Sequence, residues 1–243
     1  MSAPLLVLFT DFGARDLYVG QVKAVLAARA PRVPVIDALH DAPDFGIEPA
    51  AHLLAALAIQ FPETSVFVAV VDPGVGGRRD AIVVKADGRS FVGPDNGLLS
   101  LVWQRARRRE CARIAWRPER LSSSFHGRDL FAPVAAALAA KRLPRDWLAR
   151  KEKPAILLPA GDLDQVIYID HYGNAVTGLR LASTKSILGV GRRRLSYRPT
   201  FSEAKGPFWY ENSMGLVEIA VPRGSAARKL RLKVGSTVAW RAP

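Results

Sequence analysis

Cysteine, methionine and long apolar runs are all scarce in this chain of 243 residues. It contains one cysteine, Cys111, and two methionines, so an internal disulfide and a cysteine-rich metal site are both excluded. The N-terminal apolar run covers only residues 5–9 and follows no basic segment, which is too short for a secretory signal. No stretch reaches the roughly 20 apolar residues that a membrane helix requires. We therefore expect a soluble, cytoplasmic protein that does not associate with a membrane.

Metal-ligand patterns are missing from the sequence as well. The four histidines are His40, His52, His126 and His171. None of them has a ligand-type spacing, and no carboxylate cluster accompanies any of them in the sequence. We therefore expect no bound metal.

Acidic residues are few relative to basic ones, with 22 Asp and Glu against 35 Lys and Arg and a formal net charge of +13. The excess is concentrated in residues 105–113, 192–198 and 228–233. A strong positive field can attract nucleic acid or other anions. Apart from Tyr197 these segments contain no aromatic residues, and they have no nucleic-acid-binding motif, so the pattern favours a solvated, arginine-rich surface. A nucleic-acid-binding protein is retained as the alternative interpretation.

The first half of the chain alternates strand and helix patterns. Strands are predicted at residues 5–10, 33–37, 66–71, 81–86 and 90–92, and helices at residues 18–29, 48–60, 98–107 and 130–141. The run at 66–71 is continuously apolar, as in a strand buried on both faces. Asp87-Gly88 predicts the turn of a hairpin. This alternation predicts an α/β domain over residues 1–150, with a mostly parallel sheet and flanking helices.

The second half has a different pattern. Residues 143–159 contain three prolines and several charges, which is typical of a linker or domain edge. Short β-rich runs follow at residues 166–169, 175–181, 216–221, 230–233 and 237–240, and Gly, Pro and Ser turns separate them. The pattern predicts a smaller antiparallel β-barrel or sandwich over residues 158–243.

A polar motif, Thr10-Asp11-Phe12-Gly13, comes directly after the first predicted strand. Ligands of α/β folds bind at the carboxyl ends of the strands. Asp11 could there accept two hydrogen bonds from a ribose diol, although a turn or helix-cap Asp would have the same position. The segment has one glycine, which excludes the G-x-G-x-x-G loop of dinucleotide-binding folds.

A glycine-rich motif runs from Asp72 to Arg79, after the most apolar strand. Its glycines allow the backbone to approach a ligand closely, and Asp72 would project into the crevice. The lack of Gly-Lys-Ser/Thr excludes a Walker-type phosphate loop. A turn Asp, or a weak surface ion pair between Asp72 and Arg79, is the structural alternative.

Two further motifs contain a histidine. In Phe125-His126-Gly127-Arg128-Asp129 the neighbouring charges could orient and tune a catalytic imidazole, while Asp129 is predicted to be the N-cap of the following helix. In Asp170-His171-Tyr172-Gly173-Asn174 the tyrosine could stack on a purine, and the asparagine amide could bind the edge of the base. Gly-Asn is also a common turn pair, so a purely structural role stays open.

Taken together, the ordered motifs TDFG, DPGVGGRR, GPDNG, FHGRDLFAPVAA, YIDHYGN and ENSMGLVEIAV span Asp11 to Val221. The set resembles the adenosine-forming S-adenosyl-L-methionine (SAM) hydrolases, also called SAM hydroxide adenosyltransferases, which are relatives of the SAM-dependent fluorinase and chlorinase. The resemblance implies an α/β domain followed by a β-barrel domain. It also implies a homotrimer that binds SAM between neighbouring subunits. SAM is then the substrate, adenosine and L-methionine are the products, and no cofactor is implied.

The resemblance also implies roles for individual residues. Asp72, Arg79 and His126 match the residues that prepare the attacking water, with the proton acceptor among them left open. The halogenating relatives have an aromatic residue in place of that aspartate, so Asp72, together with Val75, indicates the hydrolytic branch. The implied ligand contacts are Asp11 for the ribose, Phe45 for the nucleoside, Asp170, Ser213 and Met214 for the methionine end, and Tyr172, Asn174, Tyr210, Glu218 and Val221 for the adenine.

The segment Val176–Gly178 reads VTG, where the family usually has Thr-Asn, and this departure lies on the adenine side. A non-catalytic sensor of SAM or adenosine would have the same fold and the same binding residues. It is therefore the second alternative to the hydrolase.

Overall fold

The computed structural model describes residues 3–241 and divides the chain into two compact units. The first contains the residues up to Ala51 together with Phe61–Ala160. The second contains His52–Gln60 and the residues from Gly161 onward. Within residues 3–241 no helix is long and apolar enough to cross a bilayer. The same residues contain no group of three or more His, Cys, Asp or Glu side chains that could hold a metal ion.

The first unit is built on a seven-stranded sheet with the order β2-β1-β3-β5-β4-β6-β7. β2, β1, β3 and β5 run parallel, and β4, β6 and β7 extend the sheet by antiparallel pairing. Its strands are β1 (Leu6–Thr10), β2 (Val35–Leu39), β3 (Val66–Val70), β4 (Ala81–Ala86), β5 (Arg89–Pro94), β6 (Arg109–Ile114) and β7 (Leu148–Lys151). The predicted α/β class is confirmed. The strands β1 and β3, which the first two polar motifs follow, belong to the parallel part of the sheet.

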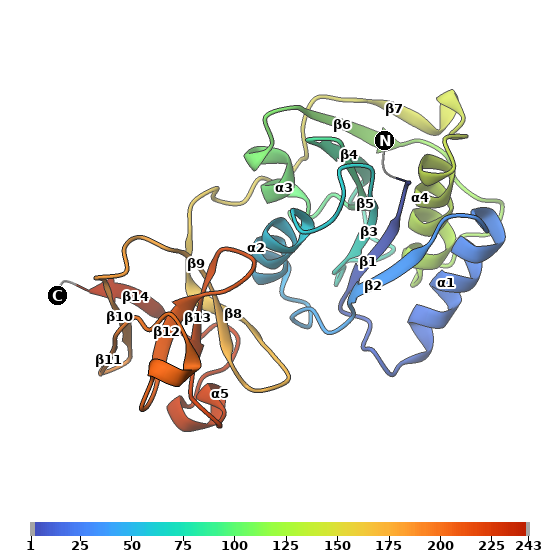
Figure 1. The fold of residues 1–243 in the computed structure, drawn as a ribbon. Coiled ribbons are helices and arrows are strands. Elements are labelled where there is room, and N and C mark those ends of the chain that lie inside the picture. Colours follow the sequence, from blue (N-terminus) through green and yellow to red (C-terminus); the bar gives the residue numbers. More distant parts are fainter. Residues whose placement is uncertain (1–2, 242–243) are drawn as a thin grey trace. The chain divides into compact units, whose positions relative to one another are not determined.

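Helices cover both faces of this sheet (Figure 1). They are α1 (Leu17–Arg29), α2 (Ile47–Ala58), α3 (Ser100–Arg105) and α4 (Ala132–Ala139). α1 and α4 lie together on one face, where Val22 and Leu26 pack in one core with Leu8 and Val68 of the sheet. α3 and the start of α2 lie on the other face. Since burying each large aliphatic side chain stabilises a fold by about 1.5–3 kcal/mol, this core holds the sheet edge in place.

The helix predicted at residues 130–141 begins earlier and differently. Gly127–Phe131 forms a π-helical turn, and α4 follows directly. The prediction that Asp129 is the N-cap is wrong, because Asp129 lies inside this turn. Its carboxylate accepts from the Ser122 amide at 2.9 Å and pairs with Arg128 at 2.6 Å. A Cβ at residue 127 would lie 3.0 Å from the Phe12 ring, so glycine permits the tight coil beside the strand end.

The segment 143–159, predicted as a linker or domain edge, is partly regular structure. A 3₁₀ turn at Arg145–Trp147 leads into β7, which pairs with β6 as the edge strand of the sheet. The Trp147 ring stacks on Trp116 with centroids 4.1 Å apart, and Lys151 Nζ lies 3.0 Å from Asp80 and 3.1 Å from Asp95. These contacts attach the first part of the segment to the first unit.

The second unit is a small antiparallel barrel. One sheet has the order β12-β13-β9-β8 and the other β11-β10-β14. Isolated bridges between Gln165 and Thr237, and between Tyr197 and Trp209, connect the edges of the two sheets. Its strands are β8 (Leu163–Ile169), β9 (Ala175–Arg180), β10 (Ile187–Val190), β11 (Arg193–Leu195), β12 (Phe208–Glu211), β13 (Leu216–Ala220) and β14 (Val238–Arg241).

Two details of this unit differ from the sequence prediction. Residues 230–233 were expected to form a strand, but α5 (Ala226–Leu230) ends there, with Arg231 in the left-handed conformation. The Ser225 hydroxyl accepts from the Arg228 amide at 3.1 Å and caps this short helix. β10, β11 and β12 were not predicted, because each is at most four residues long. Such strands offer too few alternating positions to show a period of two.

Candidate active site

Asp72, Arg79 and His126 form a connected group in the first unit. Arg79 Nε lies 3.1 Å and 3.0 Å from the two carboxylate oxygens of Asp72, and Arg79 Nη2 also donates to Asp72 Oδ2. The same Nη2 lies 3.0 Å from His126 Nδ1. The side chains of Arg79 and Asp72 are 11% and 4% exposed. This is a largely buried network, unlike the weak surface pair that the sequence left open.

The local sequence explains how these residues meet. Asp72 follows the buried strand β3, and the glycine-rich loop turns the chain back so that Arg79 faces Asp72. Gly76 has φ +77°, and a Cβ there would lie 2.2 Å from the Ser123 carbonyl oxygen. Only glycine allows this close approach. The loop therefore packs against residues 122–124, directly before His126.

The contact with Arg79 defines the state of the His126 ring. A guanidinium only donates hydrogen bonds, so Nδ1 accepts and the neutral ring has its proton on Nε2. Burial, followed by the positive charge of Arg79, lowers the pKa of His126 below its usual value of 6.5, and the charge of Asp72 acts in the opposite direction. The ring is consequently neutral at pH 7.

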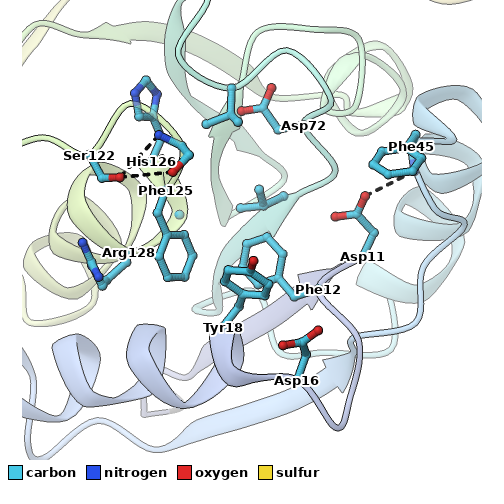
Figure 2. A pocket seen from close by; sticks show the side chains of 14 residues that line it. Asp11, Phe12, Asp16, Tyr18, Phe45, Asp72, Ser122, Phe125, His126 and Arg128 are labelled. Atoms are coloured by element: carbon cyan, nitrogen blue, oxygen red, sulfur yellow. Dashed lines mark hydrogen bonds between the residues drawn. The ribbon is translucent and has the colours of Figure 1, made fainter.

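Asp72 and His126 line a cavity of about 500 Å³ in the first unit, together with Asp11 and Phe45. Figure 2 shows the rings of Phe12, Tyr18 and Phe125 gathered in this cavity, with Asp11 to their right and with Asp72 and His126 above them in this view. The three ring centroids lie 5.3 to 5.9 Å apart. Arg79 contacts both Asp72 and His126, so the structure brings all five residues predicted for this domain together.

Asp11 lies at the end of β1, where its carboxylate accepts from the Phe45 amide at 3.3 Å. Burial raises the pKa of Asp11, and the charges of Asp44 and Asp72 act in the same direction, while backbone hydrogen bonds oppose them. Phe45 has φ +58°, and its ring is 74% exposed. A non-glycine residue in this conformation is strained, which is frequent at binding sites.

The second unit contains two adjoining pockets. One, of about 550 Å³, is lined by Asp170, Tyr172, Asn174, Tyr210, Ser213, Met214 and Glu218. The other, of about 390 Å³, contains Val221 and Arg228. Tyr172, Asn174 and Phe201 line both pockets. All the residues predicted for the barrel domain therefore lie around one aromatic-edged depression.

Several of these polar groups have partners within their own unit. Glu218 accepts from the Tyr210 hydroxyl at 2.5 Å and from the Asn212 amide at 2.9 Å. Burial, followed by the hydrogen bond with Glu218, raises the pKa of Tyr210. The Asn174 amide nitrogen donates to Asp170 at 2.9 Å. These bonds fix the shape of the pocket and the directions of the side chains that line it.

Sequence reasoning missed two contributors to this depression. Phe201 lines both pockets, but it precedes β12 in a segment without any strand or helix pattern that could have identified it. Asn212 accepts from the Met214 and Leu216 amides at 3.0 and 3.1 Å, and thereby shapes the turn that presents Ser213. An Asn before a Ser-Met-Gly turn was the signal available for it.

The fold and the site define a class: a two-domain enzyme with an α/β domain, a β-barrel domain and a buried carboxylate–guanidinium–imidazole group beside a cavity. Comparison with family models gives the family. Residues 6–147 match the SAM hydroxide adenosyltransferase N-terminal domain, and residues 164–239 match the C-terminal domain of the same family. The chain belongs to the SAM hydroxide adenosyltransferase family.

Individual relatives agree with this assignment. The chain is 41% identical to an (R)-S-adenosyl-L-methionine hydrolase of Thermus thermophilus, over 94% of this chain and 96% of the relative. It is 27% identical to a fluorinase of Actinopolyspora mzabensis, over 98% and 97% of the two chains. A solved structure of an uncharacterised conserved protein from Thermotoga maritima matches with a TM-score of 0.87 and 30% identity, over 98% of this chain and all of that one.

Proposed function

We propose that this protein hydrolyses SAM to adenosine and L-methionine by attack of water at C5′ of the ribose. The observation that carries the proposal is one cavity that is lined by Asp72 and His126 and also by Asp11. A water held by the first two residues would face a ribose held by the third. The family membership and the hydrolase relative point to the same reaction.

The reaction needs a positioned water more than an acid. The sulfonium of SAM departs as a neutral thioether, so the leaving group takes no proton. In one step the water oxygen forms a bond to C5′, the C5′–S bond breaks, and the electron pair of that bond stays on sulfur. One proton of the water is released, so the products are adenosine, L-methionine and H⁺.

The triad divides this work. Arg79 is always protonated, and it occupies the single lone pair of His126 Nδ1. Asp72 Oδ1 has a second lone pair besides the one that accepts from Arg79 Nε, so we assign acceptance of the water proton to Asp72, which lines the cavity. His126 orients the water, and Arg79 holds both groups and stabilises the negative charge that develops on the oxygen. Such preorganised charges act strongly where bulk water is excluded.

The binding roles that we propose for the remaining residues are those that the family resemblance implies, with Phe201 added. Asp11 would accept from the ribose diol, and Phe45 would lie against the nucleoside. Tyr172 and Phe201 would stack on the adenine, with Asn174, Tyr210, Glu218 and Val221 around the base. Asp170, Ser213 and Met214 would hold the methionine end. SAM is the substrate in this scheme, and neither a cofactor nor a metal takes part.

Our proposal includes a homotrimer in the cytoplasm, in which the α/β domain of one subunit and the barrel of the next enclose SAM. The support is chemical, because ribose-type and purine-type residues lie in different units. Sedimentation analysis tests the assembly, and full SAM turnover by a dilute monomer would contradict it.

The direct experiment is incubation with SAM in H₂¹⁸O, followed by chromatography and mass spectrometry. We expect adenosine with ¹⁸O at its 5′-hydroxyl, and unlabelled methionine. In chloride buffer we expect adenosine and no 5′-chloro-5′-deoxyadenosine, since Asp72 would repel an anion at the position of the water. Binding of SAM without any product would favour the sensor. Salt-dependent binding of DNA or RNA by a protein that ignores SAM would favour the nucleic-acid alternative.

A further inference from the structure

Two loops of the first unit are joined behind Asp11. One contains residues 10–13 and the other residues 40–45. The Gly13 amide donates to the His40 carbonyl at 2.8 Å, and the Ala42 amide donates to the Thr10 carbonyl at 3.1 Å. The Phe45 amide, from the second loop, donates to the Asp11 carboxylate. The direction of Asp11 therefore depends on how the two loops are held together.

A buried side-chain contact also connects the two loops. Thr10 Oγ1 lies 2.9 Å from His40 Nδ1 and accepts from the Phe12 amide at 3.3 Å. Thr10 is 1% exposed and His40 is 7% exposed. The Thr10 hydroxyl thus connects the His40 imidazole with the Phe12 amide, and Thr10 and Phe12 are the two neighbours of Asp11 in the chain.

The far side of the His40 ring faces a carboxylate. His40 Nε2 lies 3.2 Å from Asp37 Oδ1, without the alignment of a full hydrogen bond. Asp37 Oδ2 in turn accepts from Lys23 Nζ at 2.9 Å. Desolvation acts against it, but the hydrogen bond and the charge of Lys23 lower the pKa of Asp37. An ionised Asp37 favours the proton on Nε2, so Nδ1 accepts and the Thr10 hydroxyl donates.

The Asp11 carboxylate needs such support because its surroundings disfavour its ionised form and hold it only weakly. Burial and the charges of Asp44 and Asp72 disfavour its ionised form. The bond from the Phe45 amide is long at 3.3 Å, beyond the usual range of strong hydrogen bonds. The backbone at residues 10–13 must therefore set the direction of the carboxylate.

We propose that His40 is a positioning residue, which acts through Thr10 to direct the Asp11 carboxylate at the ribose hydroxyls of the substrate. The inference rests on the proposed function and adds His40, Thr10 and Asp37 to it. None of the three lines the cavity with Asp11. Their effect therefore reaches the ligand through the two loops that they join, and the proposal assigns it to the ribose contact of Asp11.

Adenosine binding tests this without any dependence on hydrolysis. Thr10→Val removes the hydroxyl and keeps the shape, while Thr10→Ser keeps the hydroxyl. His40→Leu removes both ring nitrogens, and His40→Asn keeps a polar atom near the position of Nδ1. Calorimetry of the whole protein with adenosine and with 2′,3′-dideoxyadenosine, which lacks both hydroxyls, gives the readout.

We expect Thr10→Val and His40→Leu to weaken adenosine binding about tenfold, as for the loss of one well-placed hydrogen bond. Binding of dideoxyadenosine should equal that of the parent protein, and Thr10→Ser and His40→Asn should restore most of the adenosine affinity. With SAM, the same variants should raise KM and leave kcat within about twofold of the parent. Thr64→Val is the matched control, since the Thr64 hydroxyl donates to the Ala3 carbonyl and Thr64 does not line the cavity.

Failure of this inference and failure of the proposed function would give different results. Equal loss of both ligands in Thr10→Val would show a general structural role and overturn the inference, as would no loss at all. Thr10→Val should also have no further effect in an Asp11→Ala background, and an unchanged tenfold loss there would overturn it too. A parent protein that binds neither adenosine nor SAM would instead remove the proposed function itself.

Discussion

The two units of the chain hold their functional groups in different ways. In the first, Asp72, Arg79 and His126 are bonded to one another, and the carboxylate–guanidinium pair is largely buried. In the second, Tyr172 is 75% exposed and Phe201 is 42% exposed. The groups to which we assign charge stabilisation are thus held by one another, and the rings to which we assign base stacking present open faces. Fixed dipoles lower a barrier without reorganisation, whereas a stacking face needs only area.

The carboxylates of the two units also differ in their hydrogen-bond partners, which are charged in the first unit and neutral in the second. Asp72 lines its cavity and is bonded to a guanidinium. Glu218 in the second unit accepts from a tyrosine and an asparagine, and Asp170 accepts from Asn174. Neutral donors fix shape without adding charge. The first unit should therefore determine rate, and the second should determine affinity.

Replacing Asp72 should give the largest effect. Asp72→Asn keeps the size of the side chain but removes the charge and the proposed proton acceptor. We expect kcat to fall about a hundredfold or more, with SAM binding within a few-fold of the parent. Single-turnover kinetics and equilibrium binding of SAM separate the two effects.

A matched control exists in the second unit. Asp162 pairs with Arg180 at 2.6 Å, and their side chains are 29% and 54% exposed. Asp162→Asn should leave kcat unchanged. Equal losses in Asp72→Asn and Asp162→Asn would indicate a general effect of charge, and the contrast between the two units would fail.

The triad should also act as one unit. Arg79→Ala removes the group that holds both Asp72 and His126, so we expect kcat to fall at least tenfold. The double variant Asp72→Asn/Arg79→Ala should lose little more than Asp72→Asn alone, since groups that act together give non-additive effects. Fully additive losses in a double-mutant cycle would mean that the two residues act separately.

Those site residues that lie in recognisable local sequence patterns could be predicted from the sequence. Asp11 and Asp72 directly follow strands, so their proximity could be inferred from the rule for strand ends. His126 could be identified only by its Gly-Arg-Asp neighbours. Phe201 could not, because it has no periodic context and reaches the pocket only through the closure of the barrel. β10 to β12 were missed for the same reason. Their neighbours lie far along the chain, and only tertiary packing selects the strand conformation.

The π-helical turn at Gly127–Phe131 shows the same limit. The apolar pattern at 130–141 favoured an ordinary helix with Asp129 as its cap. The structure instead begins the helix at a glycine in contact with Phe12, whose side chain is distant in sequence. A local pattern thus located the helix but not the geometry of its first turn, which is where His126 is placed.

Substitutions of the exposed rings should change affinity rather than rate. Tyr172→Ala and Phe201→Ala each remove one stacking face, which contributes roughly 1–3 kcal/mol per base. We expect KM for SAM to rise about tenfold in each variant with kcat within a few-fold of the parent, measured by steady-state kinetics. Tyr172→Phe keeps the ring and should behave like the parent. A fall in kcat without any change in KM would assign these rings to the chemical step.

The smallest expected effect is on the titration of His126, and its sign follows from the charges around the ring. Burial and then Arg79 lower the pKa of His126, and Asp72 raises it. Arg79→Gln removes the positive charge, so the pKa of His126 should rise. Asp72→Asn removes the negative charge, so the pKa of His126 should fall further.

The pH dependence of the parent protein follows from the same pKa. Because Nδ1 must stay unprotonated to accept from Arg79, kcat of the parent should be constant above this pKa and decline as the pH drops through it, at a midpoint below 6.5. Histidine NMR titrations, with His126→Asn to assign the signal, measure the shifts, and opposite shifts in the two variants are the expected result. Negligible shifts in both variants would mean that solvent screens both neighbours, and the first unit would then be as open as the second.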